Sequence, residues 1–203
     1  KGFCAGADMS VFAQKATPEQ RRDYIIDQYQ PLMGKFFDLK KPIIGAINGT
    51  AAGVGASFAL ACDFRVMSSE SAILFAFINI GLGPDGGASW LLSRQVGYSK
   101  ALEIATSGEK IFGDECLKLG LTNKIVETNN ILSQAQKWAS KLAEKPTLAI
   151  GITKQDIFYS MNNDLKKTIA YEAERQILAF GSHDLKEGVS AFIEKRKPNF
   201  LGK

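Results

Sequence analysis

Hydrophobic positions follow two different periods along the chain. Short apolar runs with the length of strands lie at residues 43–47, 64–67, 73–77 and 121–126. Longer segments, in which apolar residues recur every three or four positions, predict helices at residues 56–62, 98–106, 113–119, 130–145, 146–159, 164–180 and 184–196. Strands that alternate with helices at this spacing predict an α/β fold.

A helix-capping signal stands at Thr17-Pro-Glu-Gln20. Thr suits the N-cap, Pro the first helical position and Gln the third. Apolar residues then recur at helical spacing at Ile25, Ile26, Tyr29, Leu32, Met33, Phe36 and Phe37. Such a stripe is more typical of a core or a subunit contact than of catalysis, and Pro31 within it predicts a kink or a division of the helix.

Glycines gather where the strand at residues 43–47 gives way to the helix at residues 56–62. Gly49, Gly53 and Gly55 let the backbone bend sharply and let another molecule approach it closely. The first amides of the following helix lack intrahelical partners, so the turn can hold an anion or a carbonyl oxygen that is gaining charge. Tight packing of the helix on the strand explains the same glycines without any ligand.

A second glycine-containing loop opens the chain as Lys1-Gly-Phe-Cys-Ala-Gly-Ala-Asp8, after an apparent strand. Two backbone donors from separate loops that converge on one oxygen are what thioester chemistry requires. The two glycine loops therefore predict one shared site, provided that the fold brings them together.

Ordered motifs in this chain resemble the crotonase (enoyl-CoA hydratase/isomerase) superfamily. They are Phe-Cys-Ala-Gly-Ala-Asp at residues 3–8, Lys-Pro-Ile-Ile-Gly-Ala-Ile-Asn-Gly at 41–49, Ala-Leu-Ala-Cys-Asp at 59–63 and the closing helix at 187–200. The resemblance, which favours the isomerase-like branch, implies an α/β spiral of ββα units at residues 1–130. It also implies a C-terminal helical trimerisation region at 131–203 and further strands before residue 1 that this chain lacks.

The resemblance also assigns site residues. The backbone amides of Ala7 and Val54 match the oxyanion hole of the family. Val54 stands where the family often has glycine, and a β-branched residue there would be strained if the site required a positive φ. The remaining positions implied by the resemblance are Lys1, Ala5, Asp8 and Lys195 for coenzyme A, and Phe77, Trp90 and Phe192 for the acyl pocket. A solvated helix end explains the basic cluster at Lys195 equally well.

Asp85 is the candidate catalytic residue. It stands just before a predicted helix, and aspartate is among the best N-caps, so capping explains it without catalysis. A carboxylate surrounded by the neighbouring apolar residues would be desolvated, which raises its pKa toward that of a useful base. By resemblance, Asp85 matches the position of a catalytic Asp or Glu in enoyl-CoA and dienoyl-CoA isomerases.

Two other positions decide which reaction to expect. Hydratases of the family hold and split a water with two glutamates, and the matching positions here are Ser57 and Phe77. Neither is a carboxylate, so we expect a double-bond shift in an acyl-CoA thioester, of the Δ3,Δ2-enoyl-CoA isomerase type or the ring isomerase type of phenylacetyl-CoA degradation. Enoyl-CoA hydration, other crotonase chemistry such as thioester hydrolysis or decarboxylation, and a catalytically weak acyl-CoA-binding subunit remain as alternatives.

Composition limits the partners. The 203 residues carry a mild net charge of +4, which favours an anionic ligand and does not indicate nucleic acid. No apolar run approaches the length needed to cross a membrane. Cys4, Cys62 and Cys116 are widely spaced, which predicts reduced thiols in a cytoplasmic protein.

The lone His183 stands in a predicted loop between Gly181 and Asp184, which favours a surface or capping role over a Ser-His-Asp triad, and one histidine cannot form a histidine-rich metal site. We therefore expect no metal and no cofactor, because coenzyme A is part of the substrate. The resemblance implies a homotrimer or a dimer of trimers.

Overall fold

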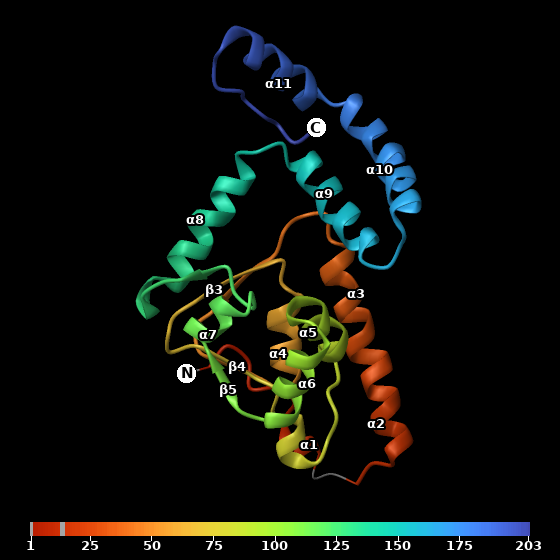
Figure 1. The fold of residues 1–203 in the computed structure, drawn as a ribbon, viewed down its shortest axis with the longest axis vertical. Helices are drawn as coiled ribbons and strands as arrows, with labels where there is room; N and C mark the ends of the chain where they lie inside the picture. Colours follow the sequence, from red (N-terminus) through yellow and green to blue (C-terminus); the bar gives the residue numbers. More distant parts are fainter. Residues whose placement is uncertain (1, 13–14) are drawn as a thin grey trace. The chain divides into compact units, whose positions relative to one another are not determined.

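The computed structural model describes residues 2–12 and 15–203, and these residues form two compact units. The first unit comprises the described residues up to Phe36 together with Ile43–Gln136. The second comprises Phe37–Pro42 and Lys137–Lys203. Figure 1 shows the order of the elements within each unit.

The strands of the first unit form two small sheets. One has the order β1-β3-β6, with both neighbouring pairs parallel: Ile44–Ile47, Phe64–Met67 and Lys124–Ile125. The other has the order β2-β4-β5, with the first pair parallel and the second antiparallel: Thr50–Ala52, Ala72–Leu74 and Lys110–Phe112. Strands and helices alternate along this unit, which confirms the predicted α/β class.

Helix α4 (Val54–Ala61) lies at the centre of the first unit. Apart from Phe58, every residue of this helix is buried, and most of its side chains are small. The core of the same unit also contains four fully buried side chains: Ile47, Val66, Ile73 and Phe75. Small side chains let a helix approach its neighbours closely, so the glycine and alanine content of this segment serves packing as well as the turn before it.

One charged side chain lies inside this core. Arg65 of β3 is only 5% exposed, and burial lowers the pKa of its guanidinium. The guanidinium donates to the carbonyl oxygens of Leu121 at 2.6 Å and Cys62 at 2.5 Å, and to Ala59 and Leu60 at 3.3 Å. Three of these acceptors belong to the last turn of α4 and its C-cap, where the helix dipole favours a positive charge.

The N-terminal helices follow the sequence signals closely. The capping box at Thr17 is present: its side chain accepts from the Gln20 amide, and the Gln20 side chain accepts from the Thr17 amide. The helical segment is divided as expected near Pro31, into α2 (Pro18–Tyr24), a π-helical turn η1 (Ile25–Tyr29) and α3 (Gln30–Asp38). A short α1 covers Met9–Phe12.

The remaining elements of the first unit include two departures from expectation. The run at residues 73–77 is a strand only as far as Leu74 and then becomes the 3₁₀-helix η2 (Ala76–Ile80). Strands β2 and β5 were not predicted. The other elements are α5 (Ala88–Val96), α6 (Tyr98–Ser107), α7 (Gly113–Lys118) and η3 (Thr128–Asn130).

The second unit is helical, as predicted. It contains the end of α8 (Ile131–Ala143), then α9 (Thr147–Ser160), α10 (Leu165–Phe180) and α11 (His183–Glu194). Helices α9 and α10 lie side by side, where Tyr159 and Tyr171 stack with ring centroids 3.9 Å apart (Figure 1). Among the described residues, no helix combines the length and the apolar character needed to cross a membrane.

Candidate active site

The two glycine loops lie against each other in the first unit. Cys4 pairs in parallel with Ala51 of β2, and the Ala52 amide donates to the Cys4 carbonyl oxygen at 2.8 Å. The opening loop therefore continues the sheet β2-β4-β5 at its β2 edge. This pairing brings together two segments that the sequence separates by more than forty residues.

Both loops leave this pairing at a glycine with positive φ. Gly6 has φ 91°, and a Cβ there would stand 2.7 Å from the Ala52 carbonyl oxygen and 3.7 Å from the Cα of Gly53. Gly53 itself has φ 56° and is the N-cap of α4. Since Ala7 follows Gly6 and Val54 follows Gly53, the two predicted oxyanion donors sit one residue beyond a close backbone contact.

Within the described residues, the amides of Ala7 and Val54 donate no hydrogen bond. Val54 is the first residue of α4 and is 5% exposed, so its amide is one of the helix-start donors that have no intrahelical acceptor. Gly53 has the positive φ and Val54 does not, so the condition under which the β-branched side chain would be strained is not met.

Asp85 lies in a glycine-rich loop that packs against the start of α4. The Ser57 hydroxyl donates to the Asp85 carbonyl oxygen at 3.0 Å. A Cβ on the next residue, Gly86, would stand 2.7 Å from Cγ2 of Val54, and Gly86 has φ 57°. The loop thus brings Asp85 next to the helix that begins with a predicted oxyanion donor.

Asp85 is half-buried, and one oxygen of its carboxylate is buried. Its Oδ1 atom has no hydrogen bond within the described residues. Burial raises the pKa of this carboxyl above the usual value of 3.8, in the direction expected from the sequence. Helix α5 begins at Ala88 with Gly87 as its N-cap and has no side-chain cap, so the alternative role of Asp85 as a capping residue is not what the structure shows.

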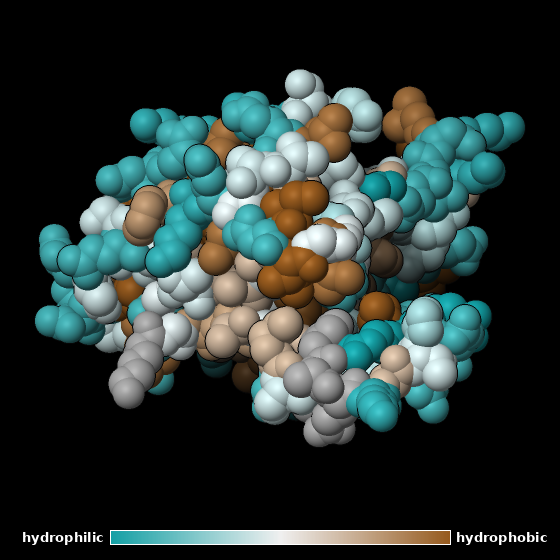
Figure 2. All heavy atoms as spheres, turned by 90° about the horizontal axis from the view of Figure 1, so that it is seen from below, coloured by the Kyte–Doolittle hydropathy of each residue, from teal (hydrophilic) through white to brown (hydrophobic). Residues whose placement is uncertain are grey.

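A cavity of about 470 Å³ opens beside this carboxylate. It is lined by Ala7, Asp8, Ala16, Gln20, Arg21, Tyr24, Ile25, Tyr29, Leu82, Gly83, Pro84 and Asp85. A largely apolar lining with a few convergent polar groups is characteristic of small-molecule sites. On the face drawn in Figure 2, hydrophobic side chains gather between hydrophilic ones.

Tyr29 is a residue of this cavity that the sequence did not single out for function. It ends the π-helical turn, and its ring packs edge-on against Tyr24 at 5.6 Å and Phe58 at 6.3 Å between centroids. Burial raises the pKa of its phenol, and the negative charge of Asp85 raises it further. Pro31 is the sequence feature that could have pointed to Tyr29. It predicts an irregular helix, and π-helical turns within a helix are often found at functional sites.

The other predicted residues of the first unit lie in different surroundings. Asp8 lines the cavity, and hydrogen bonds from the Ser10 side chain and from the Ser10 amide, the latter at 2.8 Å, lower the pKa of its carboxyl. Ala5 is exposed, and Lys1 lies outside the described residues.

Phe77, predicted for the acyl pocket, is buried in η2. The Arg94 guanidinium lies over the Trp90 ring, 4.0 Å from the ring centroid. Among the described lining residues, neither aromatic side chain borders the cavity.

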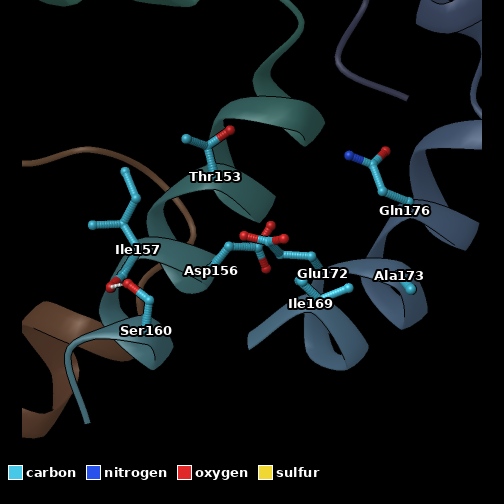
Figure 3. Close-up of a pocket in the computed structure, with 8 residues that line it drawn as sticks. All are labelled: Thr153, Asp156, Ile157, Ser160, Ile169, Glu172, Ala173 and Gln176. Atoms are coloured by element: carbon cyan, nitrogen blue, oxygen red, sulfur yellow. Dashed lines mark hydrogen bonds between the residues drawn. The ribbon is translucent and has the colours of Figure 1, made fainter. Parts of the chain in front are cut away.

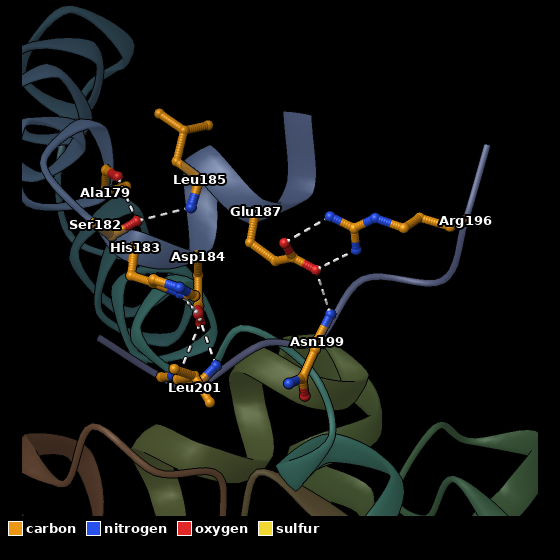
Figure 4. A network of polar contacts seen from close by, with 10 residues as sticks. Ala179, Ser182, His183, Asp184, Leu185, Glu187, Arg196, Asn199 and Leu201 are labelled. Carbon is orange, nitrogen blue, oxygen red and sulfur yellow. Dashed lines mark hydrogen bonds and ion pairs between the residues drawn. The ribbon is translucent and has the colours of Figure 1, made fainter. Parts of the chain in front are cut away.

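Phe192 and Lys195 belong to the second unit, at the end of α11. Phe192 is 85% exposed and borders a cavity of about 440 Å³ within that unit. Lys195 is the C-cap of α11 in the left-handed conformation, with φ 56°. The segment after it is tied back to the helix, because Glu187 accepts from Arg196 and from the Asn199 amide, and Asp184 accepts from the Leu201 amide (Figure 4).

A third cavity, of about 480 Å³, lies between α9 and α10. Figure 3 shows the side chains of Asp156 and Glu172 pointing into the space between these helices. Asp156 is paired with Arg175 at 3.6 Å. The cavity beside Asp85 has the more apolar lining, and Ala7 of the opening glycine loop borders it. It is therefore the better candidate for an active site.

Known proteins resemble this chain over its full length. The family model described as enoyl-CoA hydratase/isomerase matches residues 1–203. A 1,2-epoxyphenylacetyl-CoA isomerase of Escherichia coli K12 is 36% identical, with 100% of this chain and 78% of that protein covered. A crotonyl-CoA hydratase of Syntrophomonas wolfei is 33% identical, with 100% and 77% covered.

Solved structures agree with the sequence comparison. An enoyl-CoA hydratase from Polaromonas sp. JS666 has a TM-score of 0.91 at 32% identity, with 98% of this chain and 77% of that chain covered. The fold is thus the α/β fold of the crotonases, with C-terminal helices. Hydratases and an isomerase both stand among the relatives, so family membership alone does not choose between the two reactions. By its sequence and its fold, this chain belongs to the enoyl-CoA hydratase/isomerase family.

Proposed function

We propose that this member of the family isomerises a carbon–carbon double bond in an acyl-CoA thioester, with Asp85 as the single acid–base residue. The observation that carries the proposal is the Asp85 carboxylate: one of its oxygens is buried with no hydrogen-bond partner in the described part of the chain, at the wall of a largely apolar cavity. Such a group has a raised pKa and unused hydrogen-bonding capacity, which are the properties of a general base that awaits a substrate.

The proposed reaction moves one proton. The Asp85 carboxylate removes a proton from C2 of a 3-enoyl-CoA, and the electron pair of that C–H bond moves into the thioester carbonyl. The protonated Asp85 then gives the proton to C4, which yields the 2-enoyl-CoA and regenerates the carboxylate. Because the proton only changes its carbon, the reaction needs no cofactor beyond the coenzyme A of the substrate.

The amides of Ala7 and Val54 are the proposed donors to the thioester oxygen. Negative charge on that oxygen grows as the proton leaves C2, so fixed donors stabilise the transition state more than the ground state. Their N–H groups make no hydrogen bond among the described residues, and this and the contact between Gly6 and Gly53 support the role. Losing one such donor typically costs about 2.7–4 kcal/mol.

Hydration is the second candidate, and the crotonyl-CoA hydratase among the relatives favours it. The residues at the two hydratase positions argue against it. Ser57 is fully buried, and its hydroxyl donates a hydrogen bond to the Asp85 carbonyl oxygen. Phe77 is also buried, and its side chain has no polar atom. Neither can hold and deprotonate a water as a carboxylate does.

Ligand and assembly complete the proposal. Lys195, with Lys1, would contact coenzyme A phosphates, and Ala5 and Asp8 would border the same ligand. Phe77, Trp90 and Phe192 remain predictions for the acyl pocket.

Exposed apolar side chains in the second unit, with Leu165 76% and Ile193 71% exposed, support assembly into a homotrimer or a dimer of trimers. The buried thiols of Cys62 and Cys116 donate to main-chain carbonyl oxygens, in keeping with reduced cysteines and a cytoplasmic protein.

The deciding experiment offers the purified protein a 3-enoyl-CoA and crotonyl-CoA side by side, and follows ultraviolet absorbance and product mass. We expect isomerisation of the first and little addition of water to the second. Asp85→Asn should lower isomerase turnover by roughly 10²–10⁴-fold, the usual weight of acid–base catalysis. Unchanged turnover in a folded Asp85→Asn variant, or rapid hydration of crotonyl-CoA, would refute the proposal.

A further inference from the structure

We infer that Ser57 is a positioning residue, whose hydroxyl fixes the base-bearing loop to the helix that supplies an oxyanion donor. The inference rests on the proposed function, since it concerns how Asp85 is aimed. It assigns a role to a buried serine that is itself unable to act on the substrate.

The loop that carries Asp85 has few anchors of its own. After Gly81 and Leu82, whose amides are bonded to η2, residues 83–87 contain Gly83, Gly86 and Gly87, and the last two have positive φ. Among the hydrogen bonds of the described residues, only the bond from Ser57 joins residues 83–87 to an element other than α5. A loop of this composition gains little order from its own backbone, so a single outside bond has a large share in fixing it.

The anchor itself is rigid. Ser57 is 0% exposed and lies in the first turn of α4, three residues after Val54. Its Oγ lies 3.0 Å from the Asp85 carbonyl oxygen, which also accepts from the Ala88 amide at 3.0 Å. Gly86 packs on Val54 and Ser57 at the same point, where a Cβ would stand 3.4 Å from Oγ of Ser57.

This arrangement connects the proposed base, Asp85, to the proposed oxyanion donor, the Val54 amide. The Val54 amide and the Ser57 hydroxyl project from one turn of one buried helix, so the bond to Asp85 sets where the base lies relative to the oxyanion donor. A single base that serves two carbons must reach both without releasing its proton to water. Small errors in position are costly for such a transfer.

The test compares Ser57→Ala with Ser71→Ala. Ser71 is also a buried serine, and its hydroxyl donates to the Ile47 carbonyl oxygen at 2.6 Å, away from the cavity. Both variants lose a buried hydroxyl-to-carbonyl hydrogen bond, and Ser71→Ala also loses the bonds between the Ser71 hydroxyl and the amide and hydroxyl of Ser68, so it is the more severe structural control. Turnover per folded protein, KM and deuterium uptake from D₂O into the product are measured for each, with Asp85→Asn beside them.

We expect Ser57→Ala to lower kcat by roughly 10–100-fold, with KM unchanged and more solvent deuterium in each product molecule. Ser71→Ala should change stability alone. A Ser57→Ala variant with the kinetics and deuterium uptake of Ser71→Ala overturns the inference while leaving the proposed function intact. If Asp85→Asn retains full turnover, the proposed function fails, and the inference fails with it.

A titration that needs no substrate separates these outcomes further. The carboxyl carbon of Asp85, followed by NMR, reports its pKa in each variant. Loss of the anchor should admit water to the loop, so the raised pKa of Asp85 should fall toward its usual value in Ser57→Ala and stay in place in Ser71→Ala. An unchanged pKa in Ser57→Ala counts against the inference whether or not the protein is an isomerase.

Discussion

Gly55 and Cys4 are in such close contact that a Cβ on Gly55 would stand 2.5 Å from the Cys4 carbonyl oxygen and 2.8 Å from the Cys4 Cβ. Gly55 lies in the first turn of α4, and Cys4 lies in the opening loop two residues before Gly6. The absence of a side chain at Gly55 is therefore what lets the two glycine loops meet.

Gly55→Ala should uncouple the loops. Alanine is normally preferred to glycine within a helix by about 0.5–1 kcal/mol, yet here the added methyl meets backbone that cannot swing away. We expect turnover to fall at least about 10-fold because the opening loop is displaced from the helix start. Gly181→Ala is the matched control, since a Cβ there would make only ordinary contacts of 3.7–3.9 Å. Equal turnover in the two variants would contradict the prediction.

Asp85→Asn should become relatively more stable as the pH rises. The pKa of Asp85 is raised in the folded protein, so the folded state binds this proton more tightly than the unfolded state. That contribution to stability is present below the unfolded pKa and is lost as the pH rises through the folded pKa. Asparagine does not titrate, so the free energy of unfolding of the variant minus that of the parent should grow from pH 4 to pH 7. Urea unfolding at both pH values measures it, and a constant difference would argue against a desolvated carboxylate.

Removing Arg65 should weaken the core without touching the cavity. Arg65→Met leaves the carbonyl oxygens of Leu121 and Cys62 without their charged donor, and we expect a loss of about 3–5 kcal/mol in the free energy of unfolding. Arg22→Met is the control, because Arg22 forms an exposed ion pair with Asp23 that is worth at most about 1 kcal/mol. Chemical denaturation of both variants gives the comparison, and similar losses would show that the buried contacts of Arg65 contribute little.

Glu187→Gln should loosen the segment after α11 in a pH-dependent way. Hydrogen bonds from Arg196 and from the Asn199 amide hold the pKa of Glu187 at about 2. A lowered pKa means that the stabilisation is fully present above the usual value of 4.5 and is lost as the pH falls toward 2. The variant should therefore show weaker protection of the Asn199 amide against hydrogen exchange at pH 7, with the difference shrinking toward pH 3.

Glu194→Gln is the control for that measurement. Glu194 also accepts from Arg196, at 2.6 Å, but it makes no bond to Asn199 among the described contacts. Protection of the Asn199 amide should stay near that of the parent. Equal loss in both variants would assign the effect to Arg196 and not to Glu187.

Local signals in the sequence predicted local structure well. The capping box at Thr17, the division near Pro31 and the helices of the second unit were each predicted from residues within one turn of the feature. The raised pKa of Asp85 followed from its apolar neighbourhood in the sequence. These features depend on short-range geometry, which residue type and spacing encode directly.

Features made by distant segments were not predicted. Strands β2 and β5 are three residues each and exist because the sheet pairs them, so no periodicity marks them. Arg65 was read as part of a strand, and its burial depends on carbonyl acceptors from other segments. The bond between Ser57 and Asp85 likewise joins residues 28 positions apart. The resemblance to a family led us to expect one shared site, but contacts such as those of Cys4 with Ala51 and of Ser57 with Asp85 exist only in the folded chain.

The row of paired residues that begins at Cys4 has a consequence for biosynthesis. Cys4 pairs with Ala51, Ala51 with Ile73, and Ile73 with Ile111, so a single rung of backbone joins four distant points of the chain. A nascent polypeptide halted ahead of β5 would carry both glycine loops but not the edge strand that completes their sheet. Non-local pairing of this kind is slow and comes late in folding. We therefore expect that the two glycine loops reach their final arrangement only after the ribosome has synthesised β5, which ends at Phe112.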